Sequence, residues 1–253
     1  MKAEILNRQF VSAFTAEGNS AVPVVGASTA SVIETVHVSC RGVTKLLRNL
    51  KSHKATGPDG NGIPARLLKE AAAEIAPAVT LLFQASLDQG KVPLSWKEAL
   101  VVPVFKKGNR SSAANYRPIS PTSILCKLCE HIVHSTVSNH LDANDILTNA
   151  QHGFRKNRLC ETQLLLTVSD LAKGLDDKSQ TDMILLDFSK AFDKVPHQRL
   201  LLNVSHCGIA GTVLAWIEDF LHGRTQKGIL EGNPWATVAS GVPQGSVLGP
   251  CCF

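Results

Sequence analysis

A short apolar run that ends in an acid is the segment of this 253-residue sequence best suited to chemistry. Met183–Leu186 is followed by Asp187, and the length and flanks of the run predict a buried strand. Such a strand would place the Asp187 carboxylate at the rim of a sheet, where it could hold Mg²⁺ together with substrate phosphates. Two such Mg²⁺ ions together bind and stabilise the attacking and leaving oxygens in phosphoryl transfer. An acid after a strand is also often only a turn or a helix cap, so these residues alone leave both readings open.

A second candidate site combines two cysteines and two histidines within nine residues, namely Cys126, Cys129, His131 and His134. These are zinc ligand types, but apolar residues recur at helical spacing through the same stretch. Four ligands on one continuous helix cannot converge on one ion. We therefore predict a helix with a buried thiol face and expect no zinc.

A third cluster places basic side chains beside an aromatic ring, at Phe154, Arg155, Lys156 and Arg158. Phosphate neutralisation combined with ring stacking suits single-stranded nucleic acid. The alternative is a buried Phe154 that leaves only the cations exposed.

Periodicity and turn residues predict helices and strands in irregular alternation, which indicates an α+β fold. Residues 1–45 are interpreted as a loosely structured lead-in. A helix is expected to begin at Pro64 and a second one to follow Pro77, ending at Gly90 as a glycine just past the helix end. Val101–Phe105 is expected to be a strand, closed by a turn at residues 106–109. Further helices are expected over Thr122–Leu141 and Thr162–Leu175, near Pro196, and over Val213–Leu221.

The composition excludes few classes of protein. Hydrophobic residues make up 44% of the chain, enough for a substantial core, and a net charge of +5 is compatible with a polyanionic partner without requiring one. No apolar stretch approaches the roughly 20 residues that span a bilayer, and no signal peptide is recognised. An intracellular protein is expected, in nucleus or cytoplasm. The seven cysteines are odd in number, which argues against a disulfide framework.

The ordered motifs of the chain resemble one known family. Leu186–His197 closely resembles the first palm motif of reverse transcriptases from non-LTR (LINE-type, jockey-like) retrotransposons, and Ser240–Pro250 resembles their second. Further matches follow the family's order at Ile5–Phe10, Gly57–Asp59, Trp96, Phe105–Gly108, Asn115–Ser120, Gln151–Lys156, Glu161–Gln163 and Arg224–Gln226.

This resemblance implies roles for individual residues. Asp187 and the backbone carbonyl of Phe188 correspond to ligands of Mg²⁺. The intact family uses two Mg²⁺ ions. The residues implied to bind a deoxynucleoside triphosphate are Arg117 and Lys106 for phosphate, Ala191 and Phe192 beside the sugar, and Gln244 and Gly245 against nucleotide and template. Phe192 would exclude a ribose 2′-hydroxyl by a steric clash. Phe154, Arg155, Lys156 and Arg158 would contact the template.

The resemblance also implies a right-hand polymerase fold made of fingers and an incomplete palm, an antiparallel sheet with packed helices, and no thumb. Residues 1–45 would be the lead-in, 46–180 the fingers and the start of the palm, and 181–253 the palm. The family's third palm motif, an aromatic-Ala-Asp-Asp hairpin, does not occur in the 253 residues. We therefore expect an RNA-directed DNA polymerase domain, with RNA template and DNA primer as partners, that is inactive by itself. A catalytically dead RNA or primer-template binding module and a non-functional pseudogene product remain alternatives, and the oligomeric state is open.

Overall fold

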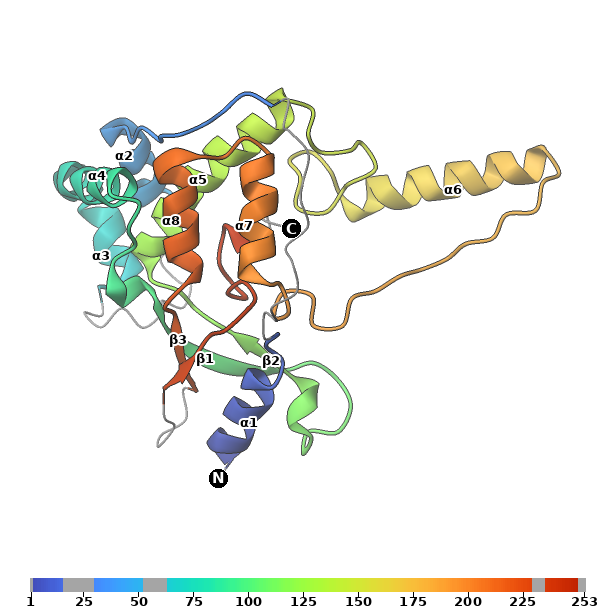
Figure 1. Ribbon diagram of the computed structural model, residues 1–253, viewed down its shortest axis with the longest axis horizontal. Helices are drawn as coiled ribbons and strands as arrows, with labels where there is room; N and C mark the ends of the chain where they lie inside the picture. The colour runs from blue at the N-terminus through green and yellow to red at the C-terminus, as the bar shows by residue number, and fades with distance from the viewer. Residues whose placement is uncertain (1, 16–29, 52–62, 229–234, 250–253) are drawn as a thin grey trace.

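The described part of the chain consists mainly of helices, with one small sheet at one end (Figure 1). The computed structural model describes residues 2–15, 30–51, 63–228 and 235–249. Within them the α-helices are α1 (Lys2–Val11), α2 (Cys40–Arg48), α3 (Ala65–Glu70), α4 (Ala72–Asp88), α5 (Ile124–Ala143), α6 (Cys160–Asp176), α7 (His197–His206) and α8 (Gly211–Leu221). Two 3-10 turns, η1 (Leu94–Trp96) and η2 (Ala113–Asn115), lie before and after the first strand. None of the described helices is long and apolar enough to cross a membrane.

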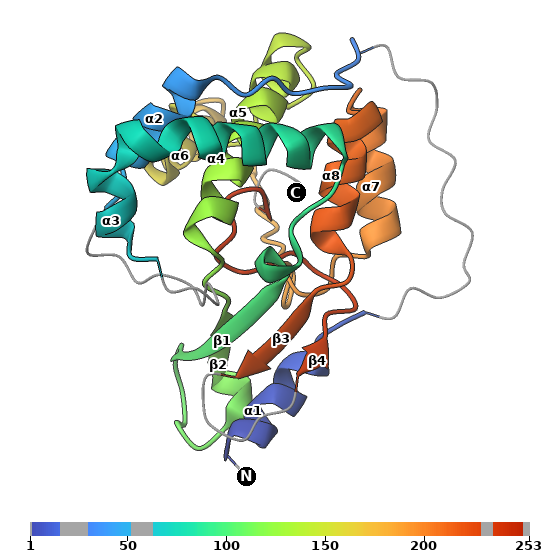
Figure 2. The same ribbon diagram turned by 90° about the vertical axis from the view of Figure 1, so that its left-hand side faces the viewer.

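Helices α2, α4, α5 and α8 pack around the main apolar core (Figure 2). Phe83 of α4 meets Trp96 edge to face, with ring centroids 6.0 Å apart, and Trp216 stacks on Phe220 at 5.5 Å. All four rings are buried. Aromatic pairs of this kind stabilise a core by about 0.5–1.5 kcal/mol beyond the burial of their surface.

Helix α4 runs through Pro77, where the sequence had indicated a break. The chain instead breaks at Ala71, between α3 and α4. Pro77 removes one backbone hydrogen bond, but the buried face formed by Ala76, Val79 and Phe83 continues past it. Packing on that face keeps the helix continuous. At the other end, Gly90 has φ +59° directly after the helix, which confirms its predicted role.

The predicted helices over Thr122–Leu141, Thr162–Leu175 and Val213–Leu221 are confirmed as α5, α6 and α8, and the helix near Pro196 as α7. Helix α5 buries Cys126 and Cys129, which confirms the thiol face. Burial raises the pKa of the Cys129 thiol to about 12. The thiol therefore stays protonated at neutral pH and behaves as a small apolar group.

The sheet has the strand order β2-β1-β3-β4, with β1 (Glu98–Phe105), β2 (Tyr116–Ile119), β3 (Thr225–Gly228) and β4 (Ala236–Thr237). β1 includes the predicted strand. The pairs β1–β2 and β3–β4 are antiparallel, but β1 pairs with β3 in parallel, so the expectation of an antiparallel sheet is wrong for that central pair. The parallel pairing of β1 with β3 follows from the long connection between them, because helices α5 to α8 return the chain to the start of β1 before β3 begins.

The lead-in is more regular than expected. Helix α1 contacts β3 and buries Phe10 (Figure 1). Helix α2 begins at Cys40, and its N-cap is Ser39, whose Oγ accepts a hydrogen bond from the N–H of Gly42 at 3.1 Å. The interpretation of residues 1–45 as loosely structured is therefore wrong for both helices. Gly57–Asp59 lies outside the described residues, as does Pro250 at the end of the second motif.

The predicted buried strand at Met183–Leu186 is the clearest error of the sequence analysis. These residues form no strand, and the side chains of Ile184, Leu185 and Leu186 are 82%, 86% and 87% exposed. Together with α6, which has no buried residue, they form an arm that projects from the rest of the molecule (Figure 1). An apolar run becomes a buried strand only where a neighbour pairs with it and covers it, and the described residues provide no such neighbour.

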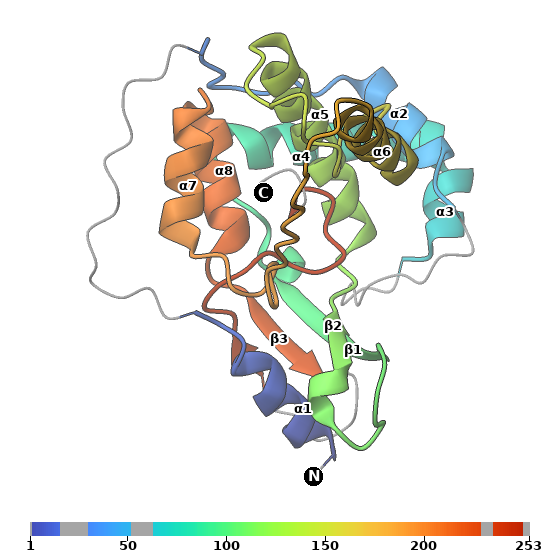
Figure 3. The ribbon, with the colours of Figure 1, turned by 90° about the vertical axis from the view of Figure 1, so that its right-hand side faces the viewer.

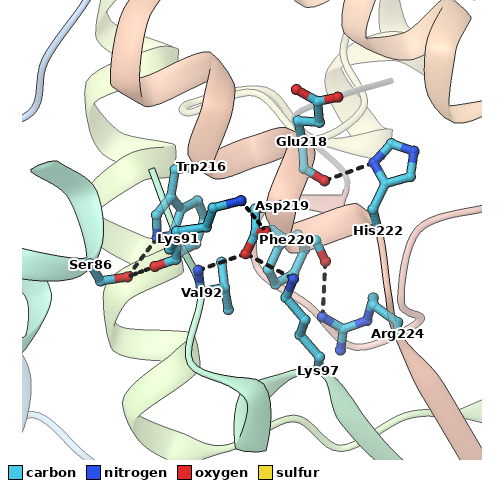
Figure 4. Close-up of polar contacts among 10 residues, drawn as sticks. All are labelled: Ser86, Lys91, Val92, Lys97, Trp216, Glu218, Asp219, Phe220, His222 and Arg224. Carbon is cyan, nitrogen blue, oxygen red and sulfur yellow. Dashed lines mark hydrogen bonds and ion pairs between the residues drawn. The ribbon is translucent and has the colours of Figure 1, made fainter. Parts of the chain in front are cut away.

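One polar cluster joins the helices to the start of the sheet (Figure 4). The Asp219 carboxylate on α8 accepts a hydrogen bond from the N–H of Val92 at 2.8 Å and forms ion pairs with Lys97 at 2.8 Å and Lys91 at 3.1 Å. Burial by itself would raise the pKa of Asp219, but these donors and charges outweigh it and hold the pKa below its usual value. The cluster thereby fixes where β1 begins.

Candidate active site

A cleft of about 630 Å³ lies between the sheet and the two segments that carry the palm-like motifs. Its walls come from α1, from the β1–β2 hairpin, from residues 187–193 and from residues 243–246. All eight residues assigned by resemblance to the metal or the nucleotide line it, namely Lys106, Arg117, Asp187, Phe188, Ala191, Phe192, Gln244 and Gly245. Residues separated by as many as 139 positions (106 to 245) therefore meet at one place.

Lys106 and Arg117 reach the cleft from the β1–β2 hairpin. Arg117 stands opposite Val104 in the ladder, and the backbone N–H of Lys106 donates to the carbonyl of Asn115 at 2.8 Å. Both side chains are exposed, and neither forms a hydrogen bond or ion pair with the described residues. The hairpin therefore holds two unneutralised cations at the cleft.

Asp187 and Phe188 line the opposite side of the cleft, at the end of the exposed arm. Asp187 forms no ion pair or hydrogen bond with the described residues. It lines the cleft, but the strand that was expected to place it at the rim of a sheet does not form.

The two motif segments dock on each other through backbone hydrogen bonds. The N–H of Val242 donates to the carbonyl of Phe192 at 2.8 Å, and the N–H of Gly241 donates to the carbonyl of Val195 at 2.9 Å. Gly241 has φ +82°, and a Cβ there would lie 2.5 Å from the Phe192 carbonyl oxygen. Only glycine allows this approach. The second motif thus lies directly against the turn within the first motif.

Gln244 is held from two sides. Its side-chain Nε2 donates to Asp193 Oδ1 at 2.7 Å, and its carbonyl accepts from the N–H of Ser120 at 2.9 Å. Gly245 has φ +112° and passes close to the Ser120 carbonyl. Burial raises the pKa of Asp193, and the hydrogen bond from Gln244 and the charge of Lys190 offset only part of this effect.

A buried carboxylate anchors the end of the same loop, which passes between α8 and α5 (Figure 3). Glu130 of α5 is 0% exposed, and its Oε2 accepts from the N–H of Val247 at 2.7 Å and of Leu248 at 3.1 Å. Burial raises the pKa of Glu130, while the two N–H donors and the charge of buried Arg224 lower it in part. Arg224 itself donates to the Phe220 carbonyl at 3.1 Å and lies over the Phe220 ring (Figure 4).

The predicted template residues do not line the cleft. Phe154 is 66% exposed, which excludes the alternative of a buried ring, and it meets Phe192 edge to face at 6.2 Å. Arg155 pairs with Asp142 at 3.0 Å, and Arg158 donates to Asn149 at 3.0 Å, so both guanidinium groups hold the local loop together. Lys156 is exposed and forms no such contact with the described residues.

Asp193 and Glu130 are the site residues that the sequence analysis missed. Asp193 lies within the first motif, but its partner lies 51 residues away. Glu130 is a charged residue on the apolar side of a predicted helix, between Cys129 and Val133, which are both buried. A charge in that position was the available signal, because buried carboxylates almost always have hydrogen-bonding partners.

Comparison with known proteins agrees with this geometry. The family model described as "Reverse transcriptase (RNA-dependent DNA polymerase)" matches residues 104–253. The RNA-directed DNA polymerase from mobile element jockey of Drosophila melanogaster is 30% identical over 220 residues, covering 85% of this chain and 24% of that protein. A probable RNA-directed DNA polymerase from transposon BS of the same species is 28% identical, over 83% of this chain and 23% of its own length. A Pol polyprotein from the type-1 retrotransposable element R2 of Popillia japonica is 26% identical, over 67% of this chain and 24% of its own.

The chain thus spans about a quarter of the length of these curated relatives. The family match includes Arg117, both motif segments and the loop at Gln244, which form most of the cleft, while α1 lies outside it. The chain therefore belongs to the reverse transcriptase (RNA-dependent DNA polymerase) family, and its relatives confirm the expected link to the non-LTR retrotransposons.

Proposed function

We propose that this chain supplies the nucleotide-binding part of an RNA-directed DNA polymerase, which adds deoxynucleotides to a primer 3′-hydroxyl opposite an RNA template. The convergence of all eight assigned residues on one cleft carries this proposal. The curated relatives named as RNA-directed DNA polymerases support it.

Arg117 and Lys106 would bind the triphosphate. A guanidinium binds phosphate oxygens in a bidentate way, and an ammonium adds a compact charge beside it. Both side chains are exposed at the cleft and are not neutralised by described carboxylates, so an anionic ligand would not have to displace an existing ion pair.

The cleft fits Mg²⁺ in part. Asp187 and the carbonyl of Phe188 would hold one ion, whose other ligands would be water and phosphate, as is usual for this cation. When bound, the ion would neutralise charge that develops on the phosphate during transfer. Asp193 is bonded to Gln244, and no group of three or more His, Cys, Asp or Glu side chains in the described residues could hold a metal. A second ion would need carboxylates from elsewhere in a longer protein, so we expect no synthesis by these 253 residues alone.

Ala191 and Phe192 would lie beside the sugar, and Gln244 and Gly245 beside the base and the template. Phe192 is half-buried and held by the Phe154 ring and by the backbone of Val242. A ring fixed in this way can select against a 2′-hydroxyl, because it cannot easily move aside.

In the right-hand description, residues 46–180 would form the fingers and the start of the palm, and residues 181–253 part of the palm, with residues 1–45 as the lead-in. We further propose an intracellular location. The sheet crosses this proposed boundary, because β1 and β2 precede residue 181 while β3 and β4 follow it.

The test is nucleotide binding by the 253-residue chain, followed with a fluorescent deoxynucleoside triphosphate and Mg²⁺. Arg117→Ala should weaken binding by about tenfold, the effect of losing one charge-assisted contact. Lys107→Ala is the matched control, because Lys107 neighbours Lys106 but does not line the cleft. Equal loss in both variants would contradict the proposal. A parent chain without cooperative unfolding would instead favour the non-functional product.

A nucleic-acid-binding module is the second candidate function, and exposed Lys156 beside exposed Phe154 favours it. Binding of a single-stranded RNA should weaken with salt and with Lys156→Ala. Lys178→Ala, at an exposed residue in the turn after α6, is the control. Arg155→Ala tests the loop instead, because its side chain already pairs with Asp142.

A further inference from the structure

Asp193 lies where the first motif, the second motif and the cleft meet. Its Oδ1 accepts from Gln244 Nε2 at 2.7 Å, and its backbone carbonyl accepts from the Ser240 hydroxyl at 2.7 Å. The side chain lines the cleft and also a neighbouring cavity of about 30 Å³. Gln244 is thus bonded to Asp193 by its side chain and to Ser120 by its backbone.

The chemistry of the pair fixes the orientation of the amide. A glutamine side chain has a donor end and an acceptor end of nearly equal size, so a neutral environment would allow either orientation. A carboxylate accepts hydrogen bonds and does not donate them. It therefore holds the NH₂ group towards Asp193 and leaves the amide oxygen and one N–H for a ligand.

We propose that Asp193 is a positioning residue of the nucleotide site, which fixes the orientation of the Gln244 amide and does not itself ligate a metal. This inference rests on the proposed function, because it assumes that Gln244 contacts the nucleotide. The docking of Val242 on Phe192 and of Gly241 on Val195 sets the distance between the two side chains. Asp193 then acts through Gln244, and a substitution of either residue removes the same contribution.

A double-mutant cycle tests this prediction with the 253-residue chain, Mg²⁺ and a fluorescent deoxynucleoside triphosphate. Asp193→Ala and Gln244→Ala should each weaken binding by about tenfold, and the double variant should be no weaker than either single variant. Asp193→Asn can pair with Gln244 in two opposite orientations, and only one of them presents the amide as in the parent, so its affinity should fall by only about twofold. Urea unfolding of each variant separates lost binding from lost folding.

Two outcomes would overturn the proposal by itself. The first is a double variant weakened by about a hundredfold, because Asp193 would then contribute independently of Gln244. The second is Asp193→Asn binding as weakly as Asp193→Ala, because the charge would then be needed, as for a metal ligand. If Asp193→Ala does not fold, the Asp193→Asn variant still decides between these two roles.

The ¹⁵N–¹H signal of the Gln244 side-chain amide is the independent readout. We expect it to move in Asp193→Ala and to stay near its parent position in Asp193→Asn. An unchanged signal in Asp193→Ala would show that the hydrogen bond does not exist and would overturn the proposal. If the signal moves as expected but Gln244→Ala binds nucleotide normally, the nucleotide role of Gln244 fails. The inference then fails with the proposed function, although the hydrogen bond itself is real.

Discussion

Replacing Glu130 by alanine tests how the loop with Gln244 is held. The substitution removes the acceptor of two backbone N–H groups, those of half-buried Val247 and buried Leu248. Each buried donor that loses its partner costs about 1–3 kcal/mol. We therefore expect Glu130→Ala to lower the free energy of unfolding by about 3 kcal/mol or more. Glu130→Gln keeps one acceptor oxygen and should cost about 1 kcal/mol.

Urea unfolding followed by circular dichroism measures this change. With a slope of about 3 kcal/mol per molar urea, the midpoint of Glu130→Ala should fall by about 1 M. Glu74→Ala is the matched control, because Glu74 is an exposed glutamate on α4 and should change stability by less than about 0.5 kcal/mol. Amide hydrogen exchange should be faster at Val247 and Leu248 in the Glu130 variant. Equal midpoints for Glu130→Ala and Glu74→Ala, with both amides still protected, would refute the reasoning.

The pH dependence of Glu130→Gln provides a second check. Burial raises the pKa of Glu130 in the folded chain above its unfolded value. Its contribution to stability is therefore fully present below the unfolded pKa and is lost as the pH rises through the folded pKa. The stability of the parent relative to Glu130→Gln should therefore fall as the pH rises above the unfolded pKa of about 4. A difference that rises with pH would show that the charged form is the favoured one.

Three further predictions concern other parts of the chain. Asp219 has a lowered pKa, so its stabilising effect should be present above the unfolded pKa and be lost as the pH falls through the folded one. In urea unfolding, Asp219→Asn should be less stable than the parent at pH 7, and the difference should shrink as the pH falls below about 4. A difference that does not shrink with falling pH would contradict the ion-pair account. Gly90→Ala should lower the free energy of unfolding by about 2 kcal/mol, because Gly90 has φ +59° and the new Cβ would lie 2.8 Å from the Cβ of Ala215. Gly153→Ala is the control and should leave the free energy of unfolding nearly unchanged, because no atom lies within 4 Å of the position of its new Cβ. Leu185→Lys should raise the highest concentration at which light scattering finds the chain monomeric, because Leu185 is an apolar residue that is 86% exposed. Greater aggregation of this variant would show that the arm is covered in solution.

Elements in which apolar residues recur at a regular spacing were predicted from the sequence, as α5, α6, α8 and β1 show. Met183–Leu186 was not, because a short apolar run indicates that a segment can be buried but not whether a neighbour covers it. The parallel pairing of β1 with β3 escaped prediction for a related reason. It depends on where a crossover of several helices returns the chain, which no local pattern specifies.

In the candidate site, too, residues recognised from their local sequence were predicted, and residues defined by distant partners were not. Motif resemblance indicated the eight residues that line the cleft, because each is recognised by its own sequence neighbours. Asp193 and Glu130 act on residues 51 and at least 117 positions away, and only the folded chain shows those partners. Arg155 was expected to contact a template, but Asp142 already pairs with it, and this contact follows from a turn whose geometry the sequence does not specify.

Photo-crosslinking with an azido-deoxynucleoside triphosphate tests most directly whether the cleft is the nucleotide site. We expect mass spectrometry to find the label on residues 9–13, 106–119, 187–193 or 243–246, which line the cleft, and excess unmodified deoxynucleotide to prevent the labelling. A label confined to other segments, or labelling that excess deoxynucleotide does not reduce, would contradict the assignment of the cleft as the nucleotide site.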